Sequence, residues 1–426
     1  MTRAKLIGIT GFCMAIATTP GRLALAQGSV PDCSTLTNTV YMAGTTAVIP
    51  VIRLFGARLK KVGVTLLWNE NSEGCSSAWN LTYPPPPGGA LSRDVYTQYT
   101  EDPNQPGKVY PTTCNSKLGQ IPDLVINDVG FSSCSKSYQG GGVFLPAGFA
   151  EFSGPVQGLV PIVASSYTYY NDITAEELQN LYVCGGKGGI LTFTVSSSIF
   201  DYNCVNSGMR ELFARGIGFP NAASLSPLVG QGCNNTITAE TMVTNNVGPA
   251  TSPDTTIGYT STEFYDQYRN LVRGLKVRGV NQKLGYWPDS SMTSTDKLNV
   301  REGRYTLQGT LRLVAAVDGN GVPTNPAAKE VIDWFQGNPV DPSLQLPFDI
   351  NEIYASGGVV PQCAMKVTKD GDLPVFKHYY PAQPCHCSYE ILATGKTSIP
   401  GCVACSNLLT CASGQVCSHG YCEQIN

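Results

Sequence analysis

Apolar residues along this chain follow two different spacings. Residues 47–61 place Val48, Ile52, Phe55 and Leu59 at intervals of four, three and four, which predicts a helix that buries one face. The short apolar runs on either side, "TVYMAG" and "VGVTLLWNE", predict strands. The segment therefore predicts a strand, a small polar loop at Gly44-Thr45-Thr46, a helix and a second strand.

The same alternation continues towards the C-terminus. Further strands are predicted at "DLVIND", "LVPIVASS", "ILTFTVSS", "TTIGYTS" and "YTLQGTLRLVAAV". Further helices are predicted at "DITAEELQNLYV", "NSGMRELFARGIG", "TEFYDQYRNLV" and "NPAAKEVIDWFQG". The first of these helices has a recognisable start, because Thr174 can cap it and Glu177 completes a capping box. Strands that alternate with helices predict a mixed α/β fold.

The N-terminus has the pattern of an export signal. Arg3 and Lys5 precede an apolar run, and Ala24-Leu25-Ala26 offers a cleavage site, so we expect a signal peptide over residues 1–26. No later run reaches the 18 or so apolar residues that a membrane-spanning helix needs. A periplasmic or secreted protein without a membrane span is expected.

The low content of charged residues argues against nucleic acid as a partner. Only 14% of residues are charged and the net charge is -3, so no basic field is available to attract nucleic acid. A surface rich in Ser, Thr, Asn and Gly suits an extracytoplasmic protein.

The cysteines point to an oxidising compartment. Of the 16, Cys13 lies in the expected leader, and the 15 that remain are an odd number, so one thiol is free or pairs with another molecule. Five crowd into "GCVACSNLLTCASGQVCSHGYCE", which predicts a small disulfide knot. The alternatives are a zinc site at Cys402, Cys405 and His419, and a copper site at Cys385-His386-Cys387.

Two polar loops precede predicted helices. Unpaired N–H groups at a helix N-terminus favour an anion or a polar oxygen, and the hydroxyls of Thr45 and Thr46 would add donors. The alternative is that Thr46 only caps its own helix. A second such junction occurs at Ser207 and Gly208 in "NSGMRELF".

These loops resemble, in order along the chain, those of the phosphate-binding class of bacterial solute-binding proteins, and more closely an exported, Cys-rich subgroup. The matching segments are Gly44-Thr45-Thr46-Ala47-Val48, "NSEGCSS", "DLVIND", "GPVQGLVPIVAS", Ser207-Gly208 and "VVPQCAMKV". The resemblance covers most of residues 41–390. It implies a two-lobed type II periplasmic binding protein fold with a small disulfide-rich C-terminal tail.

The resemblance also implies domain boundaries and a site. Residues 27–395 would form the binding domain, with one lobe at about 33–155 and 257–395, the other at about 156–256, and the tail at 396–426. The expected ligand-binding residues are Gly44, Thr45, Thr46, Ser76, Ser77, Asn127, Asp128, Asn203, Ser207 and Gly208.

Three positions depart from the family pattern. Asn203 stands where the phosphate receptors have Arg, Met209 where they have Thr, and Asn127 where they have Ser. Loss of a charge-assisted Arg contact costs about 1.5 to 3 kcal/mol, so we expect phosphate to bind about ten- to a hundredfold more weakly than in those receptors. Arg210 is the nearest substitute in the sequence.

The first functional hypothesis is capture of a small polar ligand, phosphate or another oxyanion or a neutral solute, for delivery to an ABC-type permease. The second is an exported interaction protein that keeps the scaffold and has no tight small ligand. An enzyme ranks third, because the three histidines, His378, His386 and His419, accompany no nucleophile motif. No cofactor and no metal are expected.

Overall fold

The computed structural model describes residues 30–70, 72, 74–82, 95–116, 120–134, 144–185, 193, 198–202, 207–222, 225, 237–337, 348–406 and 411–425. Its core is a ten-stranded sheet in the order β4-β3-β2-β1-β5-β12-β6-β9-β8, with β10 paired to β6. The strands of this sheet are β1 (Thr39–Gly44), β2 (Thr65–Trp68), β3 (Val95–Glu101), β4 (Val109–Asn115), β5 (Leu124–Asn127), β6 (Phe149–Ala164), β8 (Ser198–Ile199), β9 (Thr256–Ser261), β10 (Val272–Gly274) and β12 (Gln308–Ala316).

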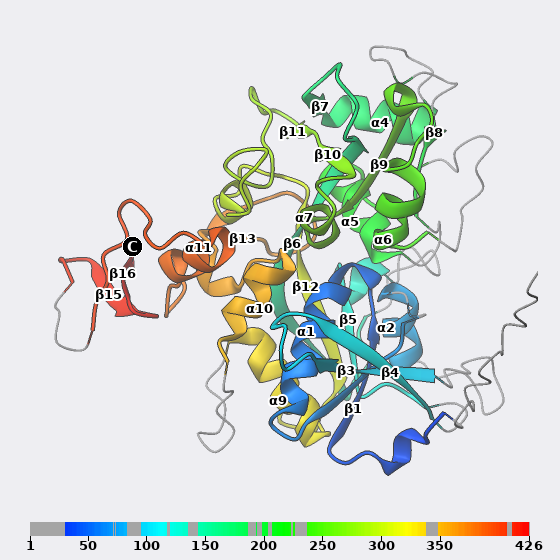
Figure 1. Ribbon diagram of the computed structural model, residues 1–426, viewed down its shortest axis with the longest axis vertical. Coiled ribbons are helices and arrows are strands. Elements are labelled where there is room, and N and C mark those ends of the chain that lie inside the picture. The colour runs from blue at the N-terminus through cyan, green and yellow to red at the C-terminus, as the bar shows by residue number, and fades with distance from the viewer. Residues whose placement is uncertain are drawn as a thin grey trace, which may run out of the picture.

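One long strand joins two parts of the molecule. The first half of β6 pairs with β12, from Phe149 to Gly158, and the second half pairs with β9 and β10, from Leu159 to Ala164. In Figure 1, β6 accordingly runs from the body that holds β1–β5 into the body that holds β8–β10. We call these bodies the first and the second lobe. The expected two-lobed α/β fold is confirmed, and the exact lobe boundaries stay a prediction.

Parallel pairing explains the buried strands of the first lobe. β1 lies between β2 and β5 and is parallel to both, so all three strands end at the same edge of the sheet. All four residues of β5 are buried, as expected for a strand covered on both faces.

Helices cover both lobes (Figure 1). Helix α1 buries Ile52, Phe55 and Leu59 as its spacing predicts, and the Phe55 ring meets the Phe335 ring of α9 edge-on at 4.9 Å. The α-helices are α1 (Ile49–Lys60), α2 (Gly74–Thr82), α4 (Ala175–Cys184), α5 (Gly208–Gly216), α6 (Ala239–Thr241), α7 (Thr262–Gln267), α8 (Leu298–Arg301), α9 (Pro326–Gln336), α10 (Ile350–Gly357) and α11 (His386–Thr394).

Short elements complete the described chain. The 3-10 helices are η1 (Cys33–Thr35), η2 (Thr46–Val48), η5 (Pro253–Thr255) and η7 (Gln362–Ala364), and a π-helix, η4, spans Met242–Val247. Two-stranded pairs are formed by β7 (Asp172–Thr174) with β11 (Lys276–Arg278), β13 (Val367–Thr368) with β14 (Lys377–His378), and β15 (Gln415–Ser418) with β16 (Tyr421–Gln424).

Two helix predictions have clear outcomes. The capping box of α4 is present, with Glu177 N–H donating to Thr174 Oγ1 at 3.0 Å and Thr174 N–H donating to the Glu177 carboxylate at 2.8 Å. The helix predicted over "TEFYDQYRNLV" is present but shorter than predicted. It ends at Gln267, and Val272 belongs to β10. The strand expected at "ILTFTVSS" lies outside the described residues apart from Phe193.

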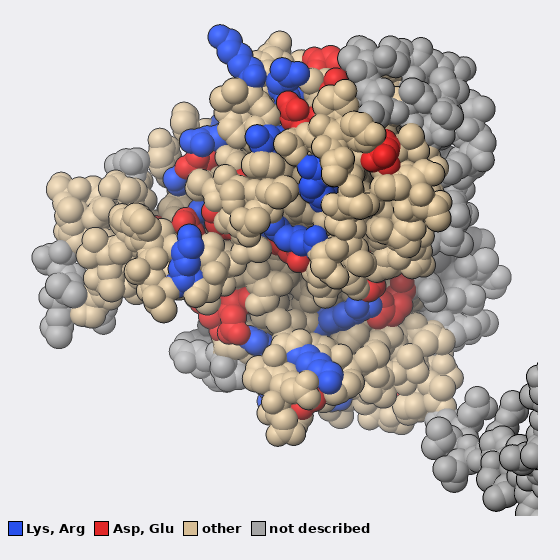
Figure 2. Space-filling model, turned by 45° about the horizontal axis from the view of Figure 1, so that its top comes forward, with Lys and Arg blue, Asp and Glu red and all other residues tan. Residues whose placement is uncertain are grey.

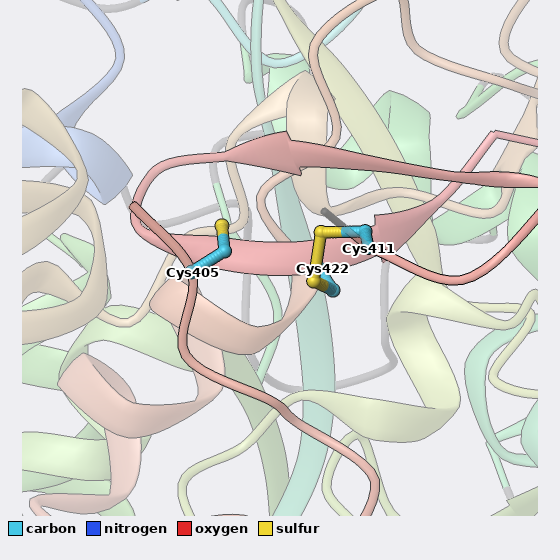
Figure 3. A group of neighbouring side chains, drawn as sticks. All are labelled: Cys405, Cys411 and Cys422. Carbon is cyan, nitrogen blue, oxygen red and sulfur yellow. A yellow bond between two sulfur atoms is a disulfide. The ribbon is translucent and has the colours of Figure 1, made fainter. Parts of the chain in front are cut away.

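The tail is a disulfide knot, as predicted. Cys402 pairs with Cys387, Cys405 with Cys417 and Cys411 with Cys422, so the zinc alternative at Cys402, Cys405 and His419 is wrong. The sulfur atoms of Cys405, Cys411 and Cys422 lie within 4.8 Å of one another because two disulfides are adjacent there (Figure 3). The tail projects from the side of the molecule (Figure 1).

Three further disulfides join described cysteines outside the tail. They join Cys33 to Cys114, Cys75 to Cys134 and Cys363 to Cys385, which also makes the copper alternative wrong. Among the described cysteines, the exposed Cys184 is the free one. Cys204 and Cys233 lie outside the described residues.

Positive and negative side chains are mixed on the surface. Lysine and arginine side chains are interspersed with aspartate and glutamate over the described residues of the face in Figure 2, so that face has no continuous patch of one sign.

None of the described helices is both long and apolar enough to cross a membrane.

Candidate functional site

The first polar loop begins where β1 ends beside β5. Gly44 has φ +147°, and a Cβ atom there would lie 1.9 Å from the Ile126 carbonyl oxygen, so the position requires glycine. Its N–H donates to Ser72 Oγ at 2.8 Å. The next residue, Thr45, donates its N–H to the same Ile126 oxygen at 3.0 Å. The loop is therefore fixed against the end of β5.

Thr45 caps the helix that follows. Its Oγ1 accepts from the Ala47 N–H at 3.2 Å, and the residue is buried. Thr46 is the first residue of η2 and is half-buried. The interpretation that Thr46 caps the helix is thus wrong by one residue.

Helix α2 brings a second N-terminus to the same place. A Cβ atom on Gly74 would lie 2.2 Å from Asn127 Oδ1, so the start of α2 packs directly on the Asn127 side chain. Ser76 is half-buried and Ser77 fully buried in the first turn of this helix.

Helix α5 approaches from the second lobe. Ser207 caps it by accepting from the Arg210 N–H at 3.3 Å. A Cβ atom on Gly208 would lie 2.6 Å from both Asn127 Oδ1 and Asp128 Oδ2. The structure thus brings Gly74 of the first lobe and Gly208 of the second together around Asn127 and Asp128. Asn203 lies outside the described residues.

Asp128 is the centre of this junction. Gln157 Nε2 donates to its Oδ1 at 2.6 Å. Its Oδ2 accepts no hydrogen bond of ordinary geometry, although the Thr45 hydroxyl and the Met209 N–H lie near enough to lower its pKa somewhat. Burial outweighs these contacts and raises the pKa of Asp128 from 3.8 to about 6.

Asn127 orients the junction. Its Oδ1 accepts from the Asp128 N–H at 3.0 Å, and its Nδ2 donates to the Val129 carbonyl oxygen at 3.0 Å. These bonds fix the side chain, so Asn127 shapes the loop that presents Asp128.

Arg210 does not supply a cation to the junction. Its Nε donates to Asp201 at 2.8 Å, and its two terminal nitrogens donate to the carbonyl oxygens of Ala222 and Leu225, each at 3.0 Å. The guanidinium is buried and serves the second lobe. Arg210 is therefore not the substitute for a family arginine that the sequence suggested.

A second buried carboxyl group, not predicted from the sequence, lies in the same network. The Gly158 N–H donates to Thr262 Oγ1 at 3.1 Å, and that hydroxyl donates to Glu263 at 3.2 Å. Burial, joined by the Asp128 charge, raises the pKa of Glu263 well above 4.5. The sequence pattern could have predicted Glu263, because Ser261-Thr262-Glu263 is another polar segment between a strand and a helix.

The other sequence candidates lie elsewhere or in the core. Trp68 is fully buried, and Trp79 stacks on Phe131 at 6.4 Å. Tyr167 is buried in the second lobe, where it stacks on Phe193 at 5.7 Å. His386 Nδ1 lies 3.0 Å from the Ala364 carbonyl oxygen, and burial lowers the pKa of His386 to about 4.

A surface pocket of about 380 Å³ lies apart from this junction. It is lined by α1, the turn between β3 and β4, and α10, with Arg53, Arg58 and Glu352 among its residues. Arg58 is already paired with Glu352 at 2.9 Å. The sequence did not indicate this pocket.

No family model and no curated protein match the chain. Solved structures do. A candidate phosphate ABC transporter substrate-binding protein from Clostridium perfringens, solved with bound phosphate, is 15% identical, with 76% of this chain and 99% of that chain covered and a TM-score of 0.46. An ABC-type phosphate transport receptor from Vibrio cholerae is 13% identical, with 75% and 99% covered and a TM-score of 0.43. The structures that this chain resembles thus include phosphate-binding proteins, as the sequence motifs implied.

Proposed function

We propose that this chain is an extracytoplasmic solute-binding protein that captures a small polar ligand between its two lobes, at the junction around Asp128. The observation that carries the proposal is the meeting of α2 and α5, one from each lobe, at the Asn127–Asp128 pair. The backbone N–H groups at a helix N-terminus are free to donate to a polar ligand. A ligand held there would contact both lobes and would stabilise their closed arrangement.

The lobes can move only if few strands connect them. β6 is the strand that pairs with both β12 and β9, and Gly158 lies near the change of partner. A Cβ atom on Gly208 would clash with Asn127 and Asp128, so the second lobe is in direct contact with these two residues. We expect ligand entry to require opening about β6.

The proposed location follows from the disulfides. Six bridges connect described cysteines, and such bridges persist in oxidising compartments. Together with the N-terminal export pattern they support a periplasmic or secreted protein. Delivery to an ABC-type permease is part of the proposal. We do not propose an enzyme, because His386 is a poor base at neutral pH and contacts a backbone carbonyl group.

Calorimetric titration tests the proposal. The mature chain is titrated with phosphate, sulfate, small sugars and small amines, and we expect one of these classes to bind more tightly than 1 mM. Gly208→Ala adds a Cβ atom 2.6 Å from Asp128 Oδ2 and should weaken binding at least about tenfold. Gly319→Ala, where the added atom meets nothing within 4 Å, should bind normally.

The alternative is an exported interaction protein without a tight small ligand. The close contact of Gly208 with Asp128 favours it, because Asp128 itself lies against the N-terminus of α5 where a ligand would lie. If no class of ligand binds above millimolar affinity to a folded chain, the alternative replaces the proposal.

A further inference from the structure

Three buried oxygen atoms at the interlobe junction accept no hydrogen bond of ordinary geometry. They are Asp128 Oδ2, Gln157 Oε1 and Glu263 Oε1, and their residues are 1%, 0% and 2% exposed. A buried acceptor without a donor costs free energy, and native structures contain few of them. Three in one region therefore require an explanation.

The three residues belong to one connected network. Gln157 donates to Asp128 at 2.6 Å, and its neighbour Gly158 donates to Thr262, which in turn donates to Glu263. The carboxyl groups also influence each other, because the Asp128 charge contributes to the raised pKa of Glu263. The residues that carry these oxygens thus lie along one chain of contacts, a cluster that runs from the loop after β5 through β6 to the start of α7.

This cluster has two acids and no compensating base. The groups that act most strongly on the two carboxyls are hydroxyls, amides and, for Glu263, the Asp128 carboxylate; no lysine or arginine of the described chain is among them. Arg210 is paired with Asp201 instead. Buried carboxylates are normally paired with a cation or remain protonated.

We infer that the interlobe junction is built for a small organic cation bearing an ammonium group, and that an oxyanion is not its ligand. An ammonium group has one positive charge, three N–H donors and no acceptor. It supplies N–H donors for acceptors of this kind and neutralises the acidic pair. This inference rests on the proposed solute-binding function and names the class of ligand.

An oxyanion would meet the opposite situation. A fully ionised oxyanion such as sulfate would add a third negative charge beside Asp128 and Glu263, and it carries no donor for Gln157 Oε1 or Glu263 Oε1. The N–H groups at the start of α5 that could serve it are already close to the Asp128 carboxylate. The cluster therefore selects against the anions that the fold would otherwise suit.

Titration calorimetry of the full mature chain at pH 8 tests the inference. The probes are methylamine and putrescine, compared at equal ionic strength with sodium phosphate, sodium sulfate and calcium chloride. We expect the amines to bind and the other three to produce no saturable heat. Glu263→Gln and Asp128→Asn should each weaken amine binding roughly ten- to a hundredfold, as removal of a charged hydrogen-bond partner does.

A matched control and separate outcomes keep the test decisive. Glu423→Gln changes another buried carboxyl, in the tail, and should leave amine binding unchanged. A cooperative thermal transition verifies that each variant is folded. Undiminished amine affinity in both cluster variants overturns the inference. If phosphate, sulfate or calcium binds and the amines do not, the ammonium inference is wrong and the proposed solute-binding function stands. If no probe binds, here or in the wider panel of the preceding subsection, both the inference and the proposed function are wrong.

Discussion

Asp128 and Glu263 are carboxyl groups that the fold buries at a cost. The pKa of Asp128 is about 6 against 3.8 for an exposed group. Keeping this group ionised at neutral pH therefore lowers the stability of the folded chain by about 3 kcal/mol. Such costs are usually retained where function needs the group. The two acids are for this reason better evidence for a site than the satisfied Asn127.

Replacing Glu263 should stabilise the protein at neutral pH. The folded pKa of Glu263 lies above the unfolded value, so the folded state holds its proton longer and stability falls as pH rises through the folded pKa. Glu263→Gln keeps an acceptor for Thr262 and has no charge to bury. We expect little change below pH 4 and a gain of about 1 to 3 kcal/mol at pH 8, measured by urea unfolding.

The control for this prediction is Glu352→Gln, because the Glu352 side chain is 45% exposed and pairs with Arg58. That variant should show no stabilisation that grows with pH. A Glu263→Gln variant whose stability difference from the parent is the same at pH 4 and pH 8 would contradict the assignment of Glu263 as a buried, costly acid.

Residues with local signals were predictable, and residues brought in by distant strands were less so. Thr45, Ser207 and Gly208 are predicted site residues because each lies in a polar loop before a helix, and Asp128 is predicted from the resemblance of "DLVIND" to a family motif. Gln157 was missed because it lies within β6, where nothing nearby in sequence shows that Asp128 is its partner. The direction of Arg210 depends on Asp201 and two carbonyl groups, which the sequence does not place.

Elements were predicted best where their ends have side-chain signals. Helix α9 lies within the predicted segment "NPAAKEVIDWFQG", between its N-cap Asn325 and its C-cap Gly337, which is in the left-handed region. Helix α7 was overestimated because tertiary pairing is stronger than helical spacing here. Its continuation supplies Val272 to a pair with Ala164 of β6. The β3–β4 hairpin was not predicted, because most of β4 is exposed and has no apolar alternation.

The capping box of α4 gives a prediction at this scale. Thr174→Ala removes the acceptor for the Glu177 N–H, and loss of a cap costs about 0.5 to 2 kcal/mol. We expect faster hydrogen exchange in the first turn of α4 and a lower urea midpoint. Thr174→Ser keeps the hydroxyl and should behave like the parent chain. Equal exchange in the alanine and serine variants would show that tertiary packing alone holds the helix.

The whole molecule combines a large sheet with a small tail, and the two are stabilised differently. The lobes bury continuous apolar clusters, whereas the tail hairpin β15–β16 has two strands and two disulfides of its own. A two-stranded hairpin is marginally stable in water, so the tail depends on its bridges. It is attached to α11 by the Cys387–Cys402 bridge and by the Glu423 carboxylate, which accepts from the Cys387 N–H at 2.7 Å.

Removal of single bridges should separate these two sources of stability. Cys405→Ser with Cys417→Ser should abolish hydrogen-exchange protection over the β15–β16 hairpin, yet shift the main calorimetric transition by less than about 0.5 kcal/mol. Cys33→Ser with Cys114→Ser opens a bridge that spans 81 residues and fixes the N-terminal segment to β4, so it should cost about 2 to 5 kcal/mol in the main transition. Cys184→Ser, at the free cysteine of the described residues, controls for the loss of sulfur. If the tail variant lowers the main transition as much as the Cys33 variant does, the tail is part of the binding domain's cooperative unit, because only shared packing could transmit its unfolding to the lobes.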